Sequence, residues 1–347
     1  MATRIISSSK VSPLGLLART LHGKEFESAR FCIFVDENTE RHCLTKLISK
    51  VGALQEAAFF EVPVGEECKQ IEIASELWQA LLEDSYDRNT VIVNLGGGAL
   101  CDLGGFVAAG FRRGIRYINI PTTLLAMVDA SIGGKTSVNL GNSKNQVGFF
   151  YPPAITCIDT DFLLSLPENH LRDGLFELRK TELLSGIATS NDSMVDLESI
   201  RQCANFKMDV CKADPNDRGI RKMLNFGHTF GHAVESFYLR QGHPVSHGTA
   251  VGIGMWCELY LSVMKLGLPE KILSDYSTWL TDKIALPRFS LNDIEIMLHF
   301  MQQDKKNADG LILCVLLMEI GAPVVDVAIN ENEIRDAFLQ LYLKNKR

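Results

Sequence analysis

The sequence predicts an α/β protein in which a parallel-sheet domain is followed by a mainly α-helical domain. Three observations predict this order. Short β-branched runs alternate with helical patterns in the first half, helical spacing prevails after about residue 165, and 347 residues exceed the usual size of one hydrophobic core. We therefore expect domains at residues 1–165 and 166–347, with a ligand site in the cleft between them.

The first domain is predicted from its strands and the helices between them. The apolar runs "RFCIFVDE", "TVIVNLGGG" and "YINIPTT" are short and rich in β-branched residues, as buried parallel strands are. Helical spacing is present in "IEIASELWQALLE" and in "ALCDLGGFVAAGF". Strands that alternate with helices indicate a parallel sheet.

The second domain is predicted to be mainly helical. Apolar residues recur every three to four positions in "LPENHLRDGLFELRKTELLSG", "SMVDLESIRQCANFKMDVCKA" and "GTAVGIGMWCELYLSVMKLG". A late apolar run, "GLILCVLLMEIG", is expected to form a small hairpin.

Composition indicates a cytoplasmic globular enzyme. A net charge of −7 argues against a nucleic-acid partner, because nucleic-acid binders usually carry a basic surplus. Nine scattered cysteines, odd in number and without a CxxC pair, favour free thiols in a reducing compartment. No run approaches the roughly 18 apolar residues of a membrane span, and the start "MATRIISSSK" lacks the apolar core of a signal peptide. We expect neither a membrane nor a nucleic-acid partner.

Three consecutive glycines, residues 96–98, lie between a predicted strand and a predicted helix. Such a turn lets backbone N–H groups and a helix N-terminus bind a pyrophosphate. The spacing departs from GxGxxG, because Cys101 occupies the third position. The turn alone therefore leaves nucleotide binding and a tight strand–helix connection both open.

The run "DASIGGKTSVN" imitates the end of a phosphate-binding P-loop. In the full P-loop pattern a glycine would precede it at position 129, where this chain has Asp129. A carboxylate there repels phosphate, so we reject a nucleoside triphosphatase. We interpret Lys135, Lys144 and Asn145 as side-chain donors on a polar loop, with solvated surface residues as the alternative.

Two histidines four residues apart in "LNFGHTFGHAVE" suggest a metal site. His228 and His232 project from one helical face, and His247 follows within twenty residues. A catalytic zinc needs three protein ligands and an open position. Spacing alone favours these three histidines, with Glu177 and Glu235 as further candidates and hydrogen-bonded structural histidines as the alternative.

Basic residues around this region suggest a substrate with phosphate or carboxylate groups. They are Lys180, Lys207, Arg221, Lys305 and Lys306. Taken singly, each could equally be a solvated helix residue.

Taken together, these motifs resemble the 3-dehydroquinate synthase family. The resemblance runs from "VDEN" at residues 35–38 to "DKKN" at residues 304–307. Its most specific parts are "GGGALCDLGGFVAAGFRRGI", "PTTLLAMVDASIGGKTSVNLGNSKNQVG", "LRDGLFELRK", "RKMLNFGHTFGHAVE" and "SHG".

The resemblance implies a Rossmann-like, NAD-binding first domain and a mainly α-helical, metal- and substrate-binding second domain. It implies that a divalent metal, zinc or cobalt, is held by Glu177, His228 and His247. The implied NAD-binding residues are Asp36, Asn38, Glu66, Lys69, Gly97, Gly98, Asp102, Thr122, Thr123 and Lys144.

The resemblance also implies substrate-contacting residues and a homodimer. Arg113 matches an arginine that reaches the substrate phosphate in the neighbouring subunit. The other matching positions are Asp129, Lys135, Asn145, Lys180, Lys207, Arg221, Asn225, His232 and Lys305, with Lys306 as the alternative to the last.

The implied activity is a step of the shikimate pathway towards chorismate and the aromatic amino acids. A phosphorylated sugar acid, 3-deoxy-D-arabino-heptulosonate 7-phosphate, becomes 3-dehydroquinate and phosphate. The route is transient NAD-dependent oxidation, phosphate elimination, re-reduction and intramolecular aldol closure. The enzyme is therefore formally a carbon–oxygen lyase.

Several positions depart from the family pattern. Thr249 follows "SHG" and Asp217 precedes "RGIR" where the family usually has glutamate. Arg179, Thr181 and Glu182 surround Lys180 where apolar or aromatic residues are typical. Another sugar-phosphate cyclase, a metal- and NAD-dependent polyol dehydrogenase and a catalytically inactive relative remain the alternative interpretations.

Overall fold

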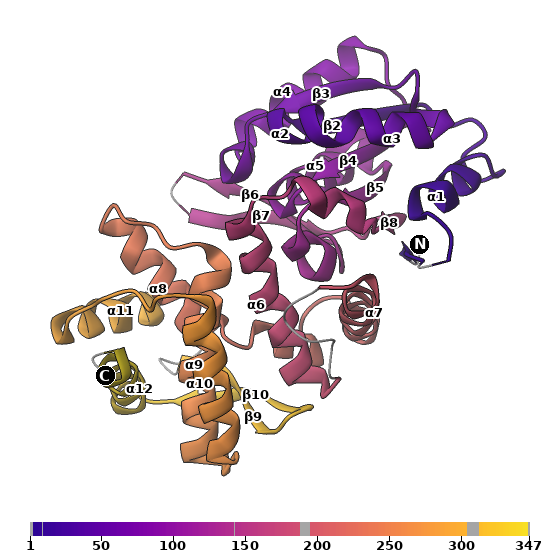
Figure 1. Ribbon diagram of the computed structural model, residues 1–347. Coiled ribbons are helices and arrows are strands. Elements are labelled where there is room, and N and C mark those ends of the chain that lie inside the picture. The colour runs from indigo at the N-terminus through magenta and orange to yellow at the C-terminus, as the bar shows by residue number, and fades with distance from the viewer. Residues whose placement is uncertain (1–2, 9, 142, 188–194, 304–311, 346–347) are drawn as a thin grey trace. The chain divides into compact units, whose positions relative to one another are not determined.

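The computed structural model describes residues 3–8, 10–141, 143–187, 195–303 and 312–345 (Figure 1). The chain divides into two compact units, each of which takes two segments of the sequence. Unit 1 consists of Met1–Gly174 and Thr189–Asn216, and unit 2 of Leu175–Ala188 and Asp217–Arg347.

Unit 1 is built on a six-stranded sheet in which every strand pairing is parallel. Such sheets are covered by helices on both faces, which explains the continuous apolar runs of their strands. In spatial order the strands are β1 (Arg4–Ile6), β8 (Ile155–Cys157), β5 (Arg116–Pro121), β4 (Val91–Gly96), β2 (Phe31–Asp36) and β3 (Ala58–Val62).

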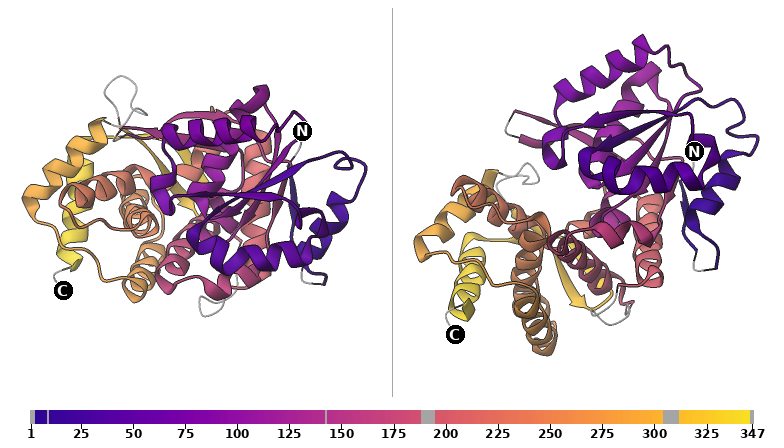
Figure 2. Two further views of the ribbon diagram at one scale, coloured as in Figure 1. Left: turned by 90° about the horizontal axis from the view of Figure 1, so that it is seen from above. Right: turned by 45° about the horizontal axis from the view of Figure 1, so that its top comes forward.

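Helices pack on both sides of this sheet (Figures 1 and 2). Cys32 and Phe34 of β2 point to one face, where they share a buried cluster with Leu77 of α4 and Leu103 of α5. The helices of unit 1 are α1 (Pro13–Leu21), α2 (Glu37–Thr39), α3 (Thr45–Lys50), α4 (Ile71–Glu83), α5 (Gly98–Gly110), α7 (Leu197–Ala213) and the start of α6 (Glu168–Ser185). Short helical turns complete the unit: η1 (Glu40–Leu44), η2 (Gly52–Leu54), η3 (Gly65–Cys68), η4 (Phe111–Arg113), η5 (Ala126–Ala130) and η6 (Thr160–Ser165).

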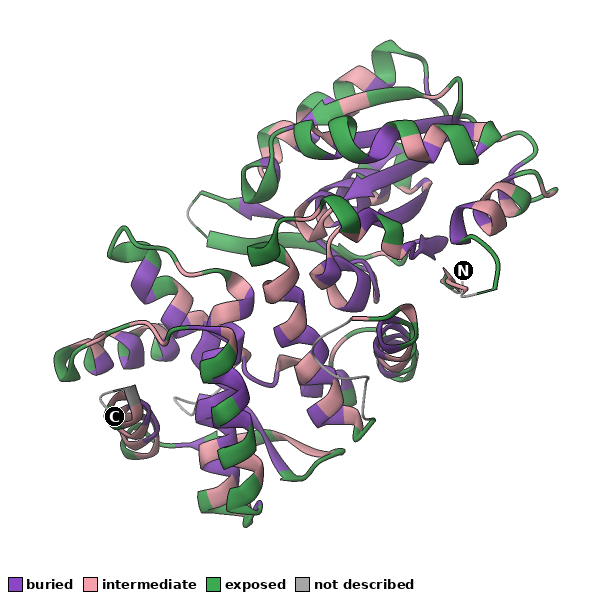
Figure 3. Cartoon of the chain, viewed as in Figure 1, coloured by how far each residue is buried: buried purple, intermediate pink, exposed green. Residues whose placement is uncertain are grey.

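A β-hairpin stands where the sequence suggested a polar loop. β6 (Lys135–Leu140) pairs antiparallel with β7 (Ser143–Phe150), so the loop interpretation of this segment was wrong. Every described residue of β7 is exposed, as its green colour in Figure 3 shows, and its sequence, polar in the first half and mostly apolar in the second, lacks the alternation of a half-buried strand. The hairpin fixes the placement of Lys135, Lys144 and Asn145.

Unit 2 is mainly helical. α9 is its central helix and is buried along most of its length (Figure 3). Its elements are the rest of α6, η7 (Ile220–Asn225), α8 (His228–Arg240), α9 (His247–Leu266), α10 (Glu270–Lys283), α11 (Leu291–Gln303), β9 (Ile312–Glu319), β10 (Ala322–Ile329) and α12 (Glu331–Asn345).

The predicted fold class is confirmed. The three quoted strand runs form β2, β4 and β5, the two quoted helical runs form α4 and α5, and the late apolar run forms half of the β9–β10 hairpin. Within the described residues, no helix is long and apolar enough to span a membrane.

Candidate active site

The switch in strand order of unit 1 brings predicted NAD-binding residues together. β2 lies between β3 and β4, so the chain moves to opposite sides of β2 in its next two strands. Asp36 ends β2 and the glycine turn ends β4, which places both at the carboxyl edge of neighbouring strands. Dinucleotides bind at this point in open parallel sheets.

The glycine turn packs tightly against Thr123 and Ala130, which leaves no room for side chains on Gly97 and Gly98. Gly97 is the N-cap of α5, and a Cβ there would lie 3.2 Å from Thr123 Cγ2. A Cβ on Gly98 would lie 2.8 Å from Ala130 Cβ. Glycine at both positions leaves the backbone N–H groups at the start of α5 accessible to a ligand.

Gly104 takes the packing role of the third glycine in a dinucleotide-binding turn, although the GxGxxG spacing is absent. A Cβ on Gly104 would lie 1.8 Å from Asn94 Oδ1, so α5 packs on β4 only because this residue is glycine. Close packing of helix on strand is the role of the third glycine in dinucleotide-binding turns. The second glycine pair in "CDLGGF" was the sequence signal for it.

Lys69 is the centre of a buried polar network in unit 1. Its Nζ donates to Asp102 Oδ2 at 2.7 Å and to Asn145 Oδ1 at 2.5 Å. Burial disfavours the charged forms of both Lys69 and Asp102. The Asp102 charge nevertheless raises the pKa of Lys69, whereas burial outweighs Lys69 and raises the pKa of Asp102.

Two residues that sequence reasoning missed extend this network to the β6–β7 hairpin. Ser137 donates to Asn145 Oδ1 at 2.8 Å, and Asn139 Oδ1 accepts from the Asn145 backbone at 2.9 Å. Asn139 also donates to Glu66 at 2.8 Å. The hairpin thus joins two predicted NAD-binding residues to the predicted substrate contact Asn145.

The remaining predicted residues of unit 1 lie on loops and element ends. Lys207 of α7 pairs with Asp129 of η5 at 2.8 Å, so these two predicted substrate contacts neutralise one another. Arg113 is exposed in η4 and has a left-handed backbone with φ of 66°. Asn38 lies in α2, Lys144 in β7, and Thr122 directly after β5, where its N–H donates to the Gly96 carbonyl at 3.0 Å.

The structure gathers Glu177, His228 and His247 in unit 2. One ligand atom from each lies within 4.8 Å of the other two. Glu177 Oε1 lies 3.8 Å from His228 Nε2 and 3.9 Å from His247 Nε2. Ligands of a tetrahedral zinc ion are separated by about 3.3 Å, so a small inward movement of these atoms suffices to hold one ion.

In both His228 and His247, the ring nitrogen Nδ1, which does not face Glu177, lies close to an oxygen atom. His228 Nδ1 lies 3.2 Å from the Phe226 carbonyl, and His247 Nδ1 lies 3.4 Å from Glu235 Oε2. Metal-binding histidines commonly donate their second ring N–H to a carbonyl or carboxylate, which directs the other nitrogen to the metal. Sequence reasoning named Glu235 as a candidate ligand, whereas here it contacts a candidate ligand from outside.

Glu177 provides a buried anionic centre. Its side chain is 1% exposed and forms an ion pair with Lys180 one turn along α6. Neither carboxylate oxygen accepts a hydrogen bond from the described residues. Lys180 balances one negative charge, but Oε1, which faces the two imidazole Nε2 atoms, is a buried acceptor that a divalent cation would satisfy. The donor set therefore fits a metal.

Burial and neighbouring carboxylates act in opposite directions on His247. Burial disfavours its protonated form, but the Glu235 hydrogen bond and the Glu177 charge outweigh burial and raise the pKa of His247. A cation is thus favoured at this position, whether it is a proton or a metal ion.

Of the other predicted residues of unit 2, His232 lies beside this cluster, and Arg221 and Asn225 precede His228 in the sequence. The His232 ring centroid lies 5.4 Å from that of His228, but His232 is outside the three-residue group. Arg221 and Asn225 lie in η7, the turn before α8, where Arg221 is 2% exposed. Lys305 and Lys306 lie outside the described residues.

Comparisons with known proteins identify the family. The 3-dehydroquinate synthase N-terminal model matches residues 59–173, and the 3-dehydroquinate synthase C-terminal model matches residues 171–307. The chain belongs to the 3-dehydroquinate synthase family.

Individual relatives agree with this membership. The 3-dehydroquinate synthase of Parabacteroides distasonis is 38% identical over 318 residues, which are 89% of each chain. The structure of ValA, a 2-epi-5-epi-valiolone synthase from Streptomyces hygroscopicus with NAD+ and Zn2+ bound, superposes with a TM-score of 0.83 at 26% identity, over 99% of this chain and 98% of ValA. A 2-deoxy-scyllo-inosose synthase shares the fold, with a TM-score of 0.81 at 24% identity over 97% and 96% of the two chains.

Two departures from the 3-dehydroquinate synthase pattern have structural explanations. Ser246 caps α9, and its hydroxyl donates to Thr249 Oγ1 at 2.9 Å, so Thr249 occupies the position that glutamate takes in a capping box. Arg179 lies about 200° round α6 from Glu177. It stacks 4.7 Å from the Trp279 ring centroid and pairs with Glu182 at 2.8 Å. Thr249 therefore contributes to the N-terminal cap of α9, and Arg179 to the packing of α6 against α10. Asp217, the third departure, adopts a left-handed backbone with φ of 55°.

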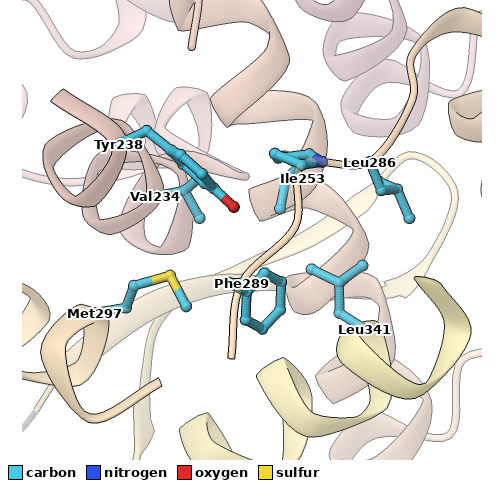
Figure 4. A pocket seen from close by; sticks show the side chains of 8 residues that line it. Val234, Tyr238, Ile253, Leu286, Phe289, Met297 and Leu341 are labelled. Carbon is cyan, nitrogen blue, oxygen red and sulfur yellow. The ribbon is translucent and has the colours of Figure 1, made fainter. Parts of the chain in front are cut away.

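A small apolar pocket in unit 2 is separate from the candidate residues of the 3-dehydroquinate synthase family (Figure 4). The Tyr238 hydroxyl donates its hydrogen bond to the Arg288 carbonyl at 2.8 Å, so it is not available to donate to a ligand in the pocket. We interpret the pocket as a packing gap. Its lining residues are Val234, Tyr238, Ile253, Leu286, Pro287, Phe289, Met297 and Leu341.

Proposed function

We propose that this chain is a 3-dehydroquinate synthase that uses NAD and one divalent metal ion, zinc or cobalt. It converts 3-deoxy-D-arabino-heptulosonate 7-phosphate to 3-dehydroquinate and phosphate. The observation that carries the proposal is the Glu177, His228 and His247 cluster in a member of this family. Identity of 38% to a 3-dehydroquinate synthase, against 26% to ValA, favours this activity over that of another cyclase.

The proposed roles follow the chemistry of each group. Bound NAD supplies a reversible hydride acceptor, and the bound metal supplies a Lewis acid. Glu177, His228 and His247 would hold the metal and leave a position open for substrate oxygens. The proposed NAD contacts are Asp36, Asn38, Glu66, Lys69, Gly97, Gly98, Asp102, Thr122, Thr123 and Lys144.

The proposed substrate contacts are mostly cations and hydrogen-bond donors. Lysine and arginine balance the phosphate and carboxylate charges of the substrate, and His232 and Asn225 supply directional hydrogen bonds. The set is Arg113, Asp129, Lys135, Asn145, Lys180, Lys207, Arg221, Asn225, His232 and Lys305.

One assay tests the activity. Purified protein with NAD and zinc or cobalt receives the heptulosonate phosphate, and both phosphate and dehydroquinate are measured. We expect equimolar release of the two without net NADH. Accumulation of NADH from a simple polyol, without phosphate release, would show a dehydrogenase instead. A cyclised product from a different phosphorylated ketose, with none from the heptulosonate, would show another cyclase.

We further propose a homodimer in which Arg113 acts in the neighbouring subunit. Exposed Leu140, Phe149 and Phe150 on the β6–β7 hairpin offer an apolar surface for association. Arg113 is exposed, as a residue that contacts a neighbouring subunit has to be in the isolated chain.

Mixed dimers test this arrangement. Arg113→Ala and His247→Ala homodimers should both be inactive. After subunit exchange at equal amounts, one intact site in half of the dimers should restore about a quarter of wild-type activity. No recovery in exchanged, dimeric samples would place Arg113 in its own subunit's site, and an active Arg113→Ala homodimer would place it outside the site.

We also propose a cytoplasmic location. All nine cysteines are buried free thiols, as expected in a reducing compartment. Cell fractionation with an antibody to the native protein would test this, and recovery in a secreted fraction would contradict it.

A further inference from the structure

We propose that Glu258 is a positioning residue for the metal centre, because it fixes the backbone that carries His228. The proposal rests on the proposed role of His228 as a metal ligand. Glu258 belongs to α9, the helix that begins with the candidate ligand His247. It therefore links the two histidines of the cluster through the protein interior.

Glu258 is a buried acceptor for one particular amide. Its side chain is 0% exposed, and Oε2 accepts a hydrogen bond from the Gly227 N–H at 2.7 Å. A buried N–H that loses its acceptor carries the full cost of desolvation, so this bond is costly to break. The carboxylate thus holds the residue immediately before His228.

Gly227 is the point at which α8 begins. It is the N-cap residue, has a left-handed backbone with φ of 81°, and supplies no side-chain cap. Glu258 provides an acceptor oxygen at this helix N-terminus from a neighbouring helix, where the first N–H groups have no partner within α8. Residue 228 is the first helical residue, so its position depends directly on where this cap is held.

The two helices meet at backbone level around this bond. A Cβ on Gly254 would lie 1.9 Å from the Gly227 carbonyl oxygen, and a Cβ on Gly231 would lie 3.0 Å from the Ala250 carbonyl oxygen. Because Gly227, Gly231 and Gly254 bring the two backbones this close, α8 has little freedom to slide along α9. The bond to Glu258 then sets the register of this contact.

Neighbouring hydrogen bonds complete the support. The Phe226 carbonyl lies 3.2 Å from His228 Nδ1, so residues 226–228 are fixed at both the backbone and the imidazole. On α9, Ser262 donates to the Glu258 carbonyl at 2.6 Å and accepts from the Leu317 N–H of β9 at 2.9 Å. These two Ser262 bonds stabilise α9 against β9 and involve neither Gly227 nor the Glu258 carboxyl group.

Cobalt titration of the metal-free protein, followed by visible absorption, tests the inference. Glu258→Met keeps the side-chain length but removes the acceptor, and should weaken cobalt binding about tenfold or more, as loss of an outer partner of a ligand typically does. Glu258→Gln keeps an oxygen for the Gly227 N–H and should stay within about threefold of wild type.

Ser262→Ala is the matched control. It removes a buried polar group one turn further along α9 without touching Gly227, and should lower the melting temperature but keep wild-type cobalt affinity. Wild-type affinity and absorption in Glu258→Met would overturn the inference. So would equal loss of affinity in Ser262→Ala and Glu258→Met at equal loss of melting temperature.

Hydrogen exchange gives a second measurement that needs no variant. In the cobalt-loaded protein the Gly227 amide should be among the most protected of residues 220–232, and rapid exchange there would overturn the inference. Failure of the wild-type protein to bind cobalt would instead refute the proposed metal centre before any variant is compared.

Discussion

His228 and His232 share one face of α8, yet only His228 lies in the three-residue cluster with Glu177 and His247. The difference arises because the third group comes from α6 rather than from α8 itself. His232 remains beside the cluster, with its ring centroid 5.4 Å from that of His228. In the proposed assignment, one helical spacing thus places a metal ligand and a substrate contact side by side.

Alanine substitutions should separate these two roles. We expect His228→Ala and His247→Ala to lose metal binding and activity together, because each removes one of three ligands. His232→Ala should retain near wild-type metal content but lose activity at least about a hundredfold, as loss of a proton-transfer or charge-stabilising group does. Metal analysis of the purified variants is the measurement. Loss of metal from His232→Ala as complete as from His228→Ala would contradict this assignment.

A second prediction concerns the buried pair of Glu177 and Lys180. Glu177→Gln removes the charge that faces both the metal and Lys180, so metal should be lost. The metal-free variant should also be destabilised, by up to about 3–5 kcal/mol relative to the metal-free wild type, because the buried Lys180 ammonium loses the charge of Glu177. Urea unfolding measures this difference. Glu182→Gln on the same helix is the control, since its partner Arg179 is partly exposed and its cost should be smaller.

At the scale of elements, α9 is tied to α12 by an ion pair. Lys265 donates to Glu333 at 2.5 Å, and both side chains are about a quarter exposed (27% and 26%). Burial acts to raise the pKa of Glu333, but the hydrogen bonds from Lys265 and from the Asn330 N–H, with the Lys265 charge, outweigh burial and lower the pKa. The charged form is thus the one that the folded state favours.

The sign of the pH effect follows from that lowered pKa. Glu333 should stabilise the fold above its unfolded-state pKa, and this contribution should disappear as pH falls through its folded-state pKa. Because the pair is partly exposed, we expect less than about 1 kcal/mol. Unfolding free energies of wild type and Glu333→Gln should differ at pH 7 and converge near pH 3. A constant difference across this range would show that packing, rather than charge, is responsible.

Element patterns predicted the buried parts of the fold better than the exposed ones. β2, β4 and β5 were visible in the sequence because parallel strands covered on both faces are continuously apolar. The β6–β7 hairpin was not visible, because all of β7 is exposed and its polar residues follow no period of two. Its placement depends on non-local bonds to Lys69 and Glu66.

Sequence spacing could connect only those candidate site residues that lie on one helix. His228 and His232 could be associated from their spacing, since one helix carries both. Glu177 is 51 positions before His228 in the sequence, and spacing does not connect them; the family resemblance did. Ser137, Asn139 and Glu258 act through contacts between distant segments, and no local pattern in the sequence indicates them.

At the scale of the whole molecule, unit 1 is discontinuous in sequence and includes a segment that follows part of unit 2. It contains α7 within Thr189–Asn216, although it otherwise ends at Gly174. Lys207 of α7 pairs with Asp129 of η5 inside this unit, and Ile200 and Ala204 of α7 are fully buried. The predicted division at residue 165 assigns α7 to the second domain, which makes the boundary open to a direct test.

Two fragments provide that test. A fragment of residues 1–216 should unfold cooperatively and bind NAD, because it retains α7. A fragment of residues 1–165 should melt at a lower temperature or without cooperativity, because the surface under α7 is exposed to water. Circular dichroism melts and NAD titration are the measurements. Equal stability of the two fragments would favour the boundary at residue 165.

The close contact of α8 with α9 limits where the chain can be mutated to change its substrate specificity. Gly227 and Gly254 have no room for even a methyl group, so mutant libraries that randomise them would consist mainly of misfolded proteins. The exposed residues Ser236 and Leu239 on the far side of α8 can vary without touching that contact. Diversity is better introduced in η7 and in the β6–β7 hairpin, where proposed substrate contacts sit outside the helix–helix crossing.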